Sequence, residues 1–167
     1  MQLSRRRLIA TLTASAGLPS IAYARTAKQI IWDDLIPPGI PYSEIVGEGV
    51  LDESIDYWRP IYDVNATKLN PILDGAYIKM PGFIIPMDQS ADGVTNFMLV
   101  PYVGACIHTP PPPPNQLVYV TNNTPWPVNA LWDPVWVTGQ MRHEIQSTDL
   151  GDTGYALIAE AMEVYEW

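Results

Sequence analysis

A run of five prolines, residues 110–114, is the feature that most constrains the fold of this 167-residue chain. Proline locks its φ angle and lacks a backbone N–H, so the run cannot continue a helix or a strand and favours a stiff polyproline II conformation. Apolar, β-like stretches flank it, at residues 99–109 and 115–120. The sequence therefore predicts two strands joined by a rigid strut. A strut inside the fold is favoured over a peptide ligand for another protein, because the chain offers its own aromatic partners, Trp126, Trp132, Trp136 and many tyrosines.

The rest of the second half reads as short strands separated by turn residues. The first of these strands is expected to bend at Pro81-Gly82, since proline removes a ladder hydrogen bond and glycine permits the bend. The last segment fits helical and strand periodicity about equally well. The predicted strands, with the last in its strand interpretation, are residues 77–87, 94–100, 116–121, 134–141 and 154–167. The pattern indicates an all-β sandwich or barrel, and these five segments favour a small five-stranded barrel.

The first 24 residues have the pattern of an export signal. Ser4-Arg5-Arg6 precedes a mildly apolar run, and Ala22-Tyr23-Ala24 provides a small-x-small cleavage site before Arg25. The paired arginines resemble a twin-arginine signal, and an ordinary secretory leader is the alternative. No later segment approaches the roughly 20 apolar residues that span a bilayer. The sequence predicts a periplasmic protein without a membrane span.

The chain beyond the leader is strongly acidic. All 18 acidic residues but only six of the nine basic ones lie after residue 24, which gives a net charge of −12. Such a charge excludes nucleic acid as a partner. The acids gather in an irregular stretch, and residues 25–71 are expected to form an extended N-terminal arm ahead of a barrel domain at residues 72–167.

Four phrases of the chain together resemble the bacterial domain-of-unknown-function family 3299. They are Trp32-Asp33-Asp34-Leu35-Ile36-Pro37; Leu73-Asp74-Gly75 leading to Pro81-Gly82-Phe83-Ile84-Ile85-Pro86; residues 97–108 followed by the prolines and Asn115-Gln116; and Pro134-Val135-Trp136-Val137-Thr138-Gly139. The resemblance implies an exported five-stranded barrel of the oligonucleotide/oligosaccharide-binding type, with the last segment as a strand. It implies no established activity. It also implies relatives that accompany exporter-like transport systems and zinc-responsive periplasmic proteins.

Cys106 and His108 are the best candidate metal ligands. In an extended chain both side chains project from one face, about 6.5 to 7 Å apart. A thiolate and an imidazole suit Zn(II) or Cu(I), but a closed site needs about three or four protein ligands. His143 is the predicted third ligand. The other candidates are Met141, Glu144, Met87 and Met98.

Two other uses of the Cys106 and His108 pair stay open. In the structural alternative, Cys106 packs as a small apolar group and His108 bonds to the backbone near the prolines. In the catalytic alternative, His108 or His143 activates the Cys106 thiol, although no orienting Asn or Asp occurs in a recognisable motif.

Residues 88–93 match the start of a calcium loop, but Leu99 stands where the loop needs glutamate, so a hairpin turn is predicted instead.

Together these observations predict a periplasmic binding or accessory protein that is not an enzyme. Its expected ligand is a transition metal, in support of envelope transport or metal homeostasis. The alternative is a structural or partner-docking module of an envelope transport complex, in which the proline strut and the acidic arm make the contact. Sugar binding on an aromatic surface is the third hypothesis.

Overall fold

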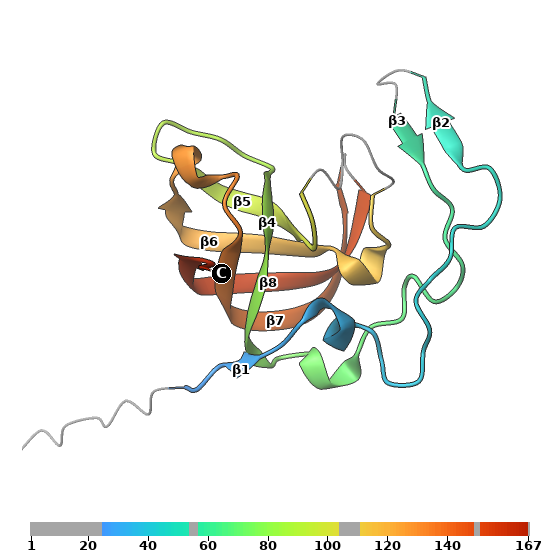
Figure 1. Ribbon diagram of the computed structural model, residues 1–167, viewed down its shortest axis with the longest axis horizontal. Coiled ribbons are helices and arrows are strands. Elements are labelled where there is room, and N and C mark those ends of the chain that lie inside the picture. Colours follow the sequence, from blue (N-terminus) through green and yellow to red (C-terminus); the bar gives the residue numbers. More distant parts are fainter. Residues whose placement is uncertain (1–24, 54–56, 104–110, 149–150, 167) are drawn as a thin grey trace, which may run out of the picture.

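The computed structural model describes residues 25–53, 57–103, 111–148 and 151–166. Five of the described strands close into a barrel (Figure 1). They are β4 (Tyr77–Pro86), β5 (Val94–Val100), β6 (Val118–Trp126), β7 (Val135–Thr148) and β8 (Gly151–Val164). Their order around the barrel is β4-β5-β6-β8-β7, and β7 pairs back with β4. The closed five-stranded barrel confirms the predicted fold class and is consistent with the oligonucleotide/oligosaccharide-binding type.

Strand β4 belongs to both halves of the barrel because it bends in the middle. Its first part, from Tyr77 to Gly82, pairs with β7, and its second part, from Phe83 to Pro86, pairs with β5. The change of partner falls directly after Pro81-Gly82, as predicted. A Cβ atom at Gly82 would lie 2.7 Å from Cγ of Leu99, so only glycine fits on the inner side of the bend.

The barrel interior is filled by alternate residues of the strands. In β4, for example, Ile78, Met80, Gly82 and Ile84 are buried, while Lys79, Pro81 and Phe83 lie partly in solvent. Val118 and Val120 of β6 and the paired strands β7 and β8 complete the core. A second, smaller apolar cluster lies on the opposite face of β5, where Met98 and Val100 alternate with the core residues. The alternation of residues along these strands thus separates the side chains inside the barrel from those on its outer surface.

The final segment is a strand up to Val164, which confirms what the resemblance implies. Strands β7 and β8 each have 14 residues and pair along their whole length except at two register shifts. Strand β8 also pairs in parallel with β6, and this pairing closes the barrel. The predicted strand at residues 134–141 is therefore only the first half of a much longer strand.

The region ahead of the barrel has two parts. Strand β1 (Lys28–Gln29) pairs with β4, and the 3₁₀ turns η1 (Trp32–Leu35) and η2 (Pro71–Leu73) place Leu35 and Leu73 in the barrel core. Between η1 and η2 the chain forms a separate two-stranded sheet, β2 (Val50–Asp52) and β3 (Tyr57–Arg59). This sheet projects from the barrel (Figure 1). Only the part that projects is an extended arm, and the residues of β1 and η1 are built into the barrel.

Two further 3₁₀ turns, η3 (Pro114–Gln116) and η4 (Val128–Ala130), complete the helical content of the described residues. None of the helices in this part of the chain has the length or the apolar character needed to cross a bilayer.

Candidate functional site at the junction of arm and barrel

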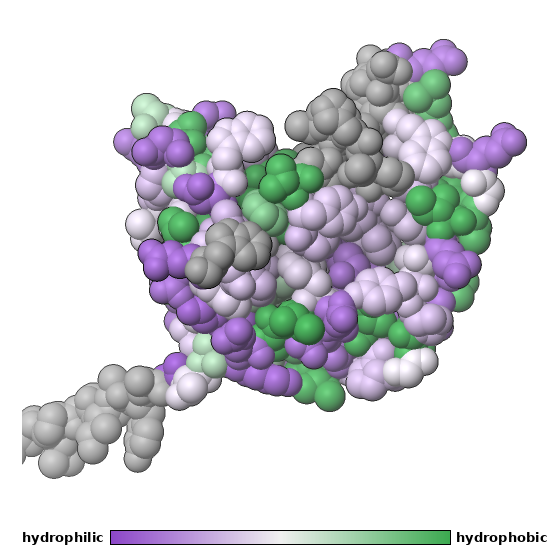
Figure 2. Space-filling model, in the orientation of Figure 1, coloured by the Kyte–Doolittle hydropathy of each residue, from purple (hydrophilic) through white to green (hydrophobic). Residues whose placement is uncertain are grey.

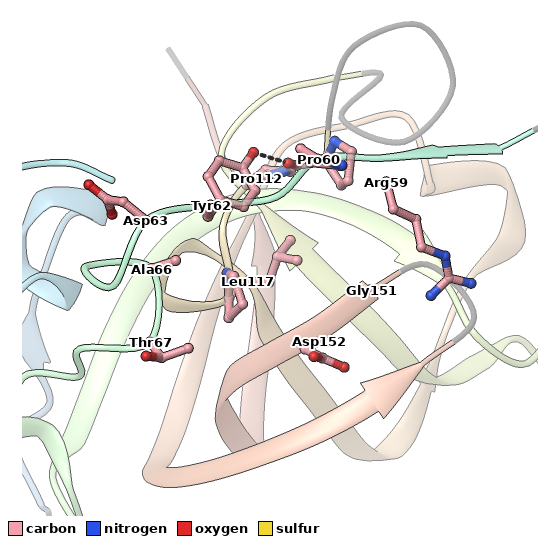
Figure 3. Close-up of a pocket in the computed structure, with 12 residues that line it drawn as sticks. Arg59, Pro60, Tyr62, Asp63, Ala66, Thr67, Pro112, Leu117, Gly151 and Asp152 are labelled. Atoms are coloured by element: carbon pink, nitrogen blue, oxygen red, sulfur yellow. Dashed lines mark hydrogen bonds between the residues drawn. The ribbon is translucent and has the colours of Figure 1, made fainter. Parts of the chain in front are cut away.

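The described part of the proline run is an internal strut. Pro111 and Pro112 are buried, and Pro113 has the polyproline II angles φ −63° and ψ 157°. The hydroxyl of Tyr62 donates a hydrogen bond to the carbonyl oxygen of Pro111 at 2.5 Å (Figure 3). The backbone N–H of Asn115 donates to the carbonyl oxygen of Ala66 at 2.9 Å. The prolines therefore hold the arm against the barrel.

The three tryptophans expected to pack on the strut make other contacts or are exposed. Trp132 is 78% exposed, and Trp136 stacks on Tyr165 with a ring-centroid distance of 5.0 Å. Trp126 packs against the barrel core and donates its indole N–H to the carbonyl oxygen of Ala130. The described hydrogen bond to the strut comes from one of the tyrosines, Tyr62, 49 residues upstream of Pro111. Tyrosines are among the expected partners, but no local pattern singles out Tyr62.

A cavity of about 290 Å³ opens where the arm, the strut and β8 meet (Figure 3). The arm contributes Arg59 and Asp63, and β8 contributes Asp152. Both carboxylates already accept local hydrogen bonds, Asp63 from the backbone N–H and the side-chain amide of Asn65, and Asp152 from the Ser147 hydroxyl. A mixture of proline rings and engaged polar groups suits binding better than acid–base chemistry.

His143 belongs to a hydrogen-bond network at one end of the barrel. Its Nε2 lies 2.8 Å from the carbonyl oxygen of Asn70, and its ring packs edge-on against Tyr155 with 5.3 Å between centroids. The buried Tyr155 hydroxyl donates to the Leu35 carbonyl at 2.5 Å and accepts from the Asn70 backbone N–H at 2.7 Å. Burial raises the pKa of Tyr155 to about 12, against the opposing effect of the Asn70 hydrogen bond. Because Nε2 of His143 is engaged, its Nδ1 is the ring atom left for a ligand.

The other predicted metal ligands fall in different environments. Cys106 and His108 lie outside the described residues. Met141 is buried in the barrel core, while Met98 belongs to the outer apolar cluster, with Met87 packed against it. Glu144 accepts a hydrogen bond from Gln146. Across residues 25–53, 57–103, 111–148 and 151–166, no group of three His, Cys, Asp or Glu side chains lies close enough to hold a metal ion.

We call the arm the ribbon, residues 44–63; its described residues, 44–53 and 57–63, form two paired segments. Its ladder continues beyond β2 and β3, because the Val46 N–H donates to the Ile61 carbonyl at 2.7 Å and the Asp63 N–H to the Glu44 carbonyl at 2.9 Å. The Trp58 indole N–H donates to the Glu48 carbonyl at 2.8 Å. These contacts hold the two segments together well outside the barrel.

Large apolar side chains of the ribbon are exposed. Val50 is 56% and Leu51 is 53% exposed, and Figure 2 shows apolar surface on the projecting ribbon next to hydrophilic side chains. The sequence indicated the acids of this region but not its apolar surface, since a short irregular stretch shows no clear periodicity. The exposed apolar residues of the ribbon and its end are Ile45, Val46, Val50, Leu51, Ile61 and Val64.

Comparisons with known proteins place the chain in a family. The family model described as "Protein of unknown function (DUF3299)" matches residues 32–164. The crystal structure of a DUF3299 family protein from Pseudomonas aeruginosa is similar in fold, with a TM-score of 0.69 and 32% identity over 86% of this chain and 99% of that one. Among curated proteins, no significant match was found. The family model spans most of the barrel and the arm, so the chain belongs to the DUF3299 family.

Proposed function

We propose that this protein is a non-enzymatic accessory protein of the bacterial cell envelope that docks on a partner protein through its ribbon. The observation that carries the proposal is the exposure of Val50, Leu51 and Ile61 on an element that stands off the barrel. Exposed apolar side chains that gather on one projecting element are typical of an interaction surface. The resemblance points to an envelope transport complex as the source of the partner.

The leader supports the location in the envelope. Arg5-Arg6 and the Ala22-Tyr23-Ala24 site give the first 24 residues the pattern of a twin-arginine signal. The proposed site of action is therefore the periplasm, with residues 25–167 as the mature chain.

The docking proposal is tested by site-specific crosslinking in cells. A photo-crosslinking amino acid at Val50 or Ile61 should give an adduct with one partner protein, and Val50→Asp should weaken the purified complex about tenfold or more, because hot-spot side chains contribute at least that much. The matched control is Trp132, which is also strongly exposed but lies outside the ribbon. Equal adducts at Trp132 and Val50, or no adduct on the ribbon, would contradict the proposal.

A second function rests on Cys106 and His108, which we propose as ligands for Zn(II) or Cu(I). Their spacing supports it, and so does the hydrogen bond from Tyr62 that holds Pro111, three residues after His108. His143 is the proposed third ligand, through Nδ1, because a ligating histidine commonly donates its other ring N–H to a carbonyl.

Elemental analysis of the untagged mature chain tests the metal proposal. After incubation with Zn(II), or with Cu(I) under reducing conditions, the wild-type chain should retain metal, and Cys106→Ser and His108→Ala should lose it. His143→Ala decides whether the third ligand is correct. Metal retained equally by Cys106→Ser, or absent from the wild type, would refute the site.

A further inference from the structure

Most charged residues of the ribbon are acidic. Residues 44–63 contain six acidic residues and one basic residue, a net charge of −5. Glu44, Glu48 and Glu53 are exposed, and no ion pair joins them to any other residue in the described ranges. An exposed apolar surface on the same element as these three glutamates favours a partner with the opposite charge.

The ribbon also leaves a strand edge unpaired. Among the described residues, β2 and β3 pair only with each other. Strand β3 is on the barrel side, because Arg59, Pro60 and Tyr62 line the cavity next to the strut (Figure 3). The outer edge is therefore β2, as Figure 1 shows. Its free backbone N–H and C=O groups are a template for one more strand.

From these observations, and resting on the proposed docking function, we infer that the ribbon binds an extended segment of its partner in which basic and apolar residues alternate. The segment adds to the outer edge of β2 as a third strand. Main-chain hydrogen bonds supply affinity in such a mode, and alternate side chains supply specificity. Lysine or arginine side chains contact the acids of the ribbon, while the apolar ones contact Val50 or Leu51.

The same charge argues against other occupants. A second copy of this chain would bring a second ribbon with a net charge of −5 against the first, and the two would repel each other. An anionic lipid surface is repelled for the same reason. A third strand would also stabilise the ribbon itself, since a two-stranded hairpin alone is marginally stable in water.

A model peptide tests the inference on the mature chain. The probe is a short labelled peptide of alternating lysine and valine, and its binding is measured by fluorescence anisotropy at low and high salt. The combined change Glu44→Gln, Glu48→Gln and Glu53→Gln should weaken binding about tenfold at low salt, and the difference should shrink as salt screens the charges. The matched control neutralises three exposed acids outside the ribbon, Asp133, Glu144 and Glu166.

Two further peptides decide the mode of binding. A peptide N-methylated along one edge should lose most of its affinity, because it cannot donate to the β2 carbonyls. A peptide of alternating glutamate and valine should not bind. Equal binding by either peptide would overturn the inference. If crosslinking in cells shows the ribbon contact but the lysine–valine peptide does not bind, the partner chemistry is wrong and the docking function stands; if neither experiment succeeds, both are wrong.

Discussion

At the scale of one residue, Asp88 shows how a side chain replaces missing backbone partners in a turn. Its carboxylate accepts hydrogen bonds from the backbone N–H groups of Thr95 and Asn96 and from both of their side chains, at 2.6–3.0 Å. The bond from the Asn96 N–H, followed by the other bonds, holds the pKa of Asp88 well below its usual range. The loop that resembles a calcium site is thus a hairpin turn closed by its own first carboxylate.

Because the folded protein lowers this pKa, the stabilisation by Asp88 is present above the unfolded-state pKa of about 4 and is lost as the pH falls below it. Asp88→Asn should lower the free energy of unfolding by about 1 kcal/mol at neutral pH, a small value because the site is open to solvent. The difference in free energy of unfolding between Asp88→Asn and the wild type, measured by urea titration, should become smaller at acid pH. Asp92→Asn, in the same loop, is the control; a difference that is constant with pH would contradict the assignment.

At the scale of an element, the β7–β8 hairpin depends on the absence of a side chain at Gly139. A Cβ atom there would lie 2.0 Å from the carbonyl oxygen of Ile158, and the strand register shifts between Thr138 and Gly139. The contacting atoms are backbone atoms of the neighbouring strand, which cannot move without disturbing the ladder. Glycine at this position therefore allows the irregular pairing along the hairpin.

We expect Gly139→Ala to destabilise the protein by about 2–3 kcal/mol, the upper part of the range typical of overpacking, because the clash is with backbone atoms. Thermal or denaturant unfolding measures the effect. Thr138→Ala, on the adjacent half-buried position, should change the free energy of unfolding by much less. A tolerated Gly139→Ala would mean that β8 can shift to make room.

At the scale of the whole molecule, the hydroxyl of Tyr155 joins three distant parts of the chain. It bonds to Leu35, 120 residues away, and to Asn70, 85 residues away, while its ring supports His143. Leu35 and Asn70 flank the two ends of the arm. The arm is thus fixed at both ends to the last strand of the barrel.

Tyr155→Phe should lower the free energy of unfolding by about 1–3 kcal/mol, because it leaves a buried carbonyl and a buried N–H without their partner. The raised pKa adds a pH test. The stabilisation by the protonated Tyr155 hydroxyl is present below the unfolded-state pKa of about 10 and is lost as the pH rises towards the folded-state pKa of about 12. The alkaline loss should be weaker in Tyr155→Phe than in the control Tyr119→Phe. If the two variants lose stability identically at alkaline pH, Tyr155 is not the source of that loss.

Local patterns predicted the barrel strands well because each depends on residues close in sequence. The alternation in β4, the bend at Pro81-Gly82 and the turn after Asp88 all follow from steric and hydrogen-bonding preferences of neighbours. The helical and strand interpretations of the last segment could not be separated in this way, since its apolar residues fit both periods. The candidate site was harder to predict, because it depends on Tyr62 reaching Pro111.

By itself the sequence determined the all-β class and the acidic charge, because local periodicity and composition carry that information, and four phrases indicated the family through their resemblance. The export signal stays a prediction. Only the tertiary structure decided that β8 lies in parallel beside β6, that Tyr62 is the aromatic residue that bonds to the strut, and that Val50 and Leu51 are exposed. These features arise from contacts between residues far apart in the chain. Whether an apolar side chain becomes core or surface depends on which distant segment covers it, and no local pattern records that.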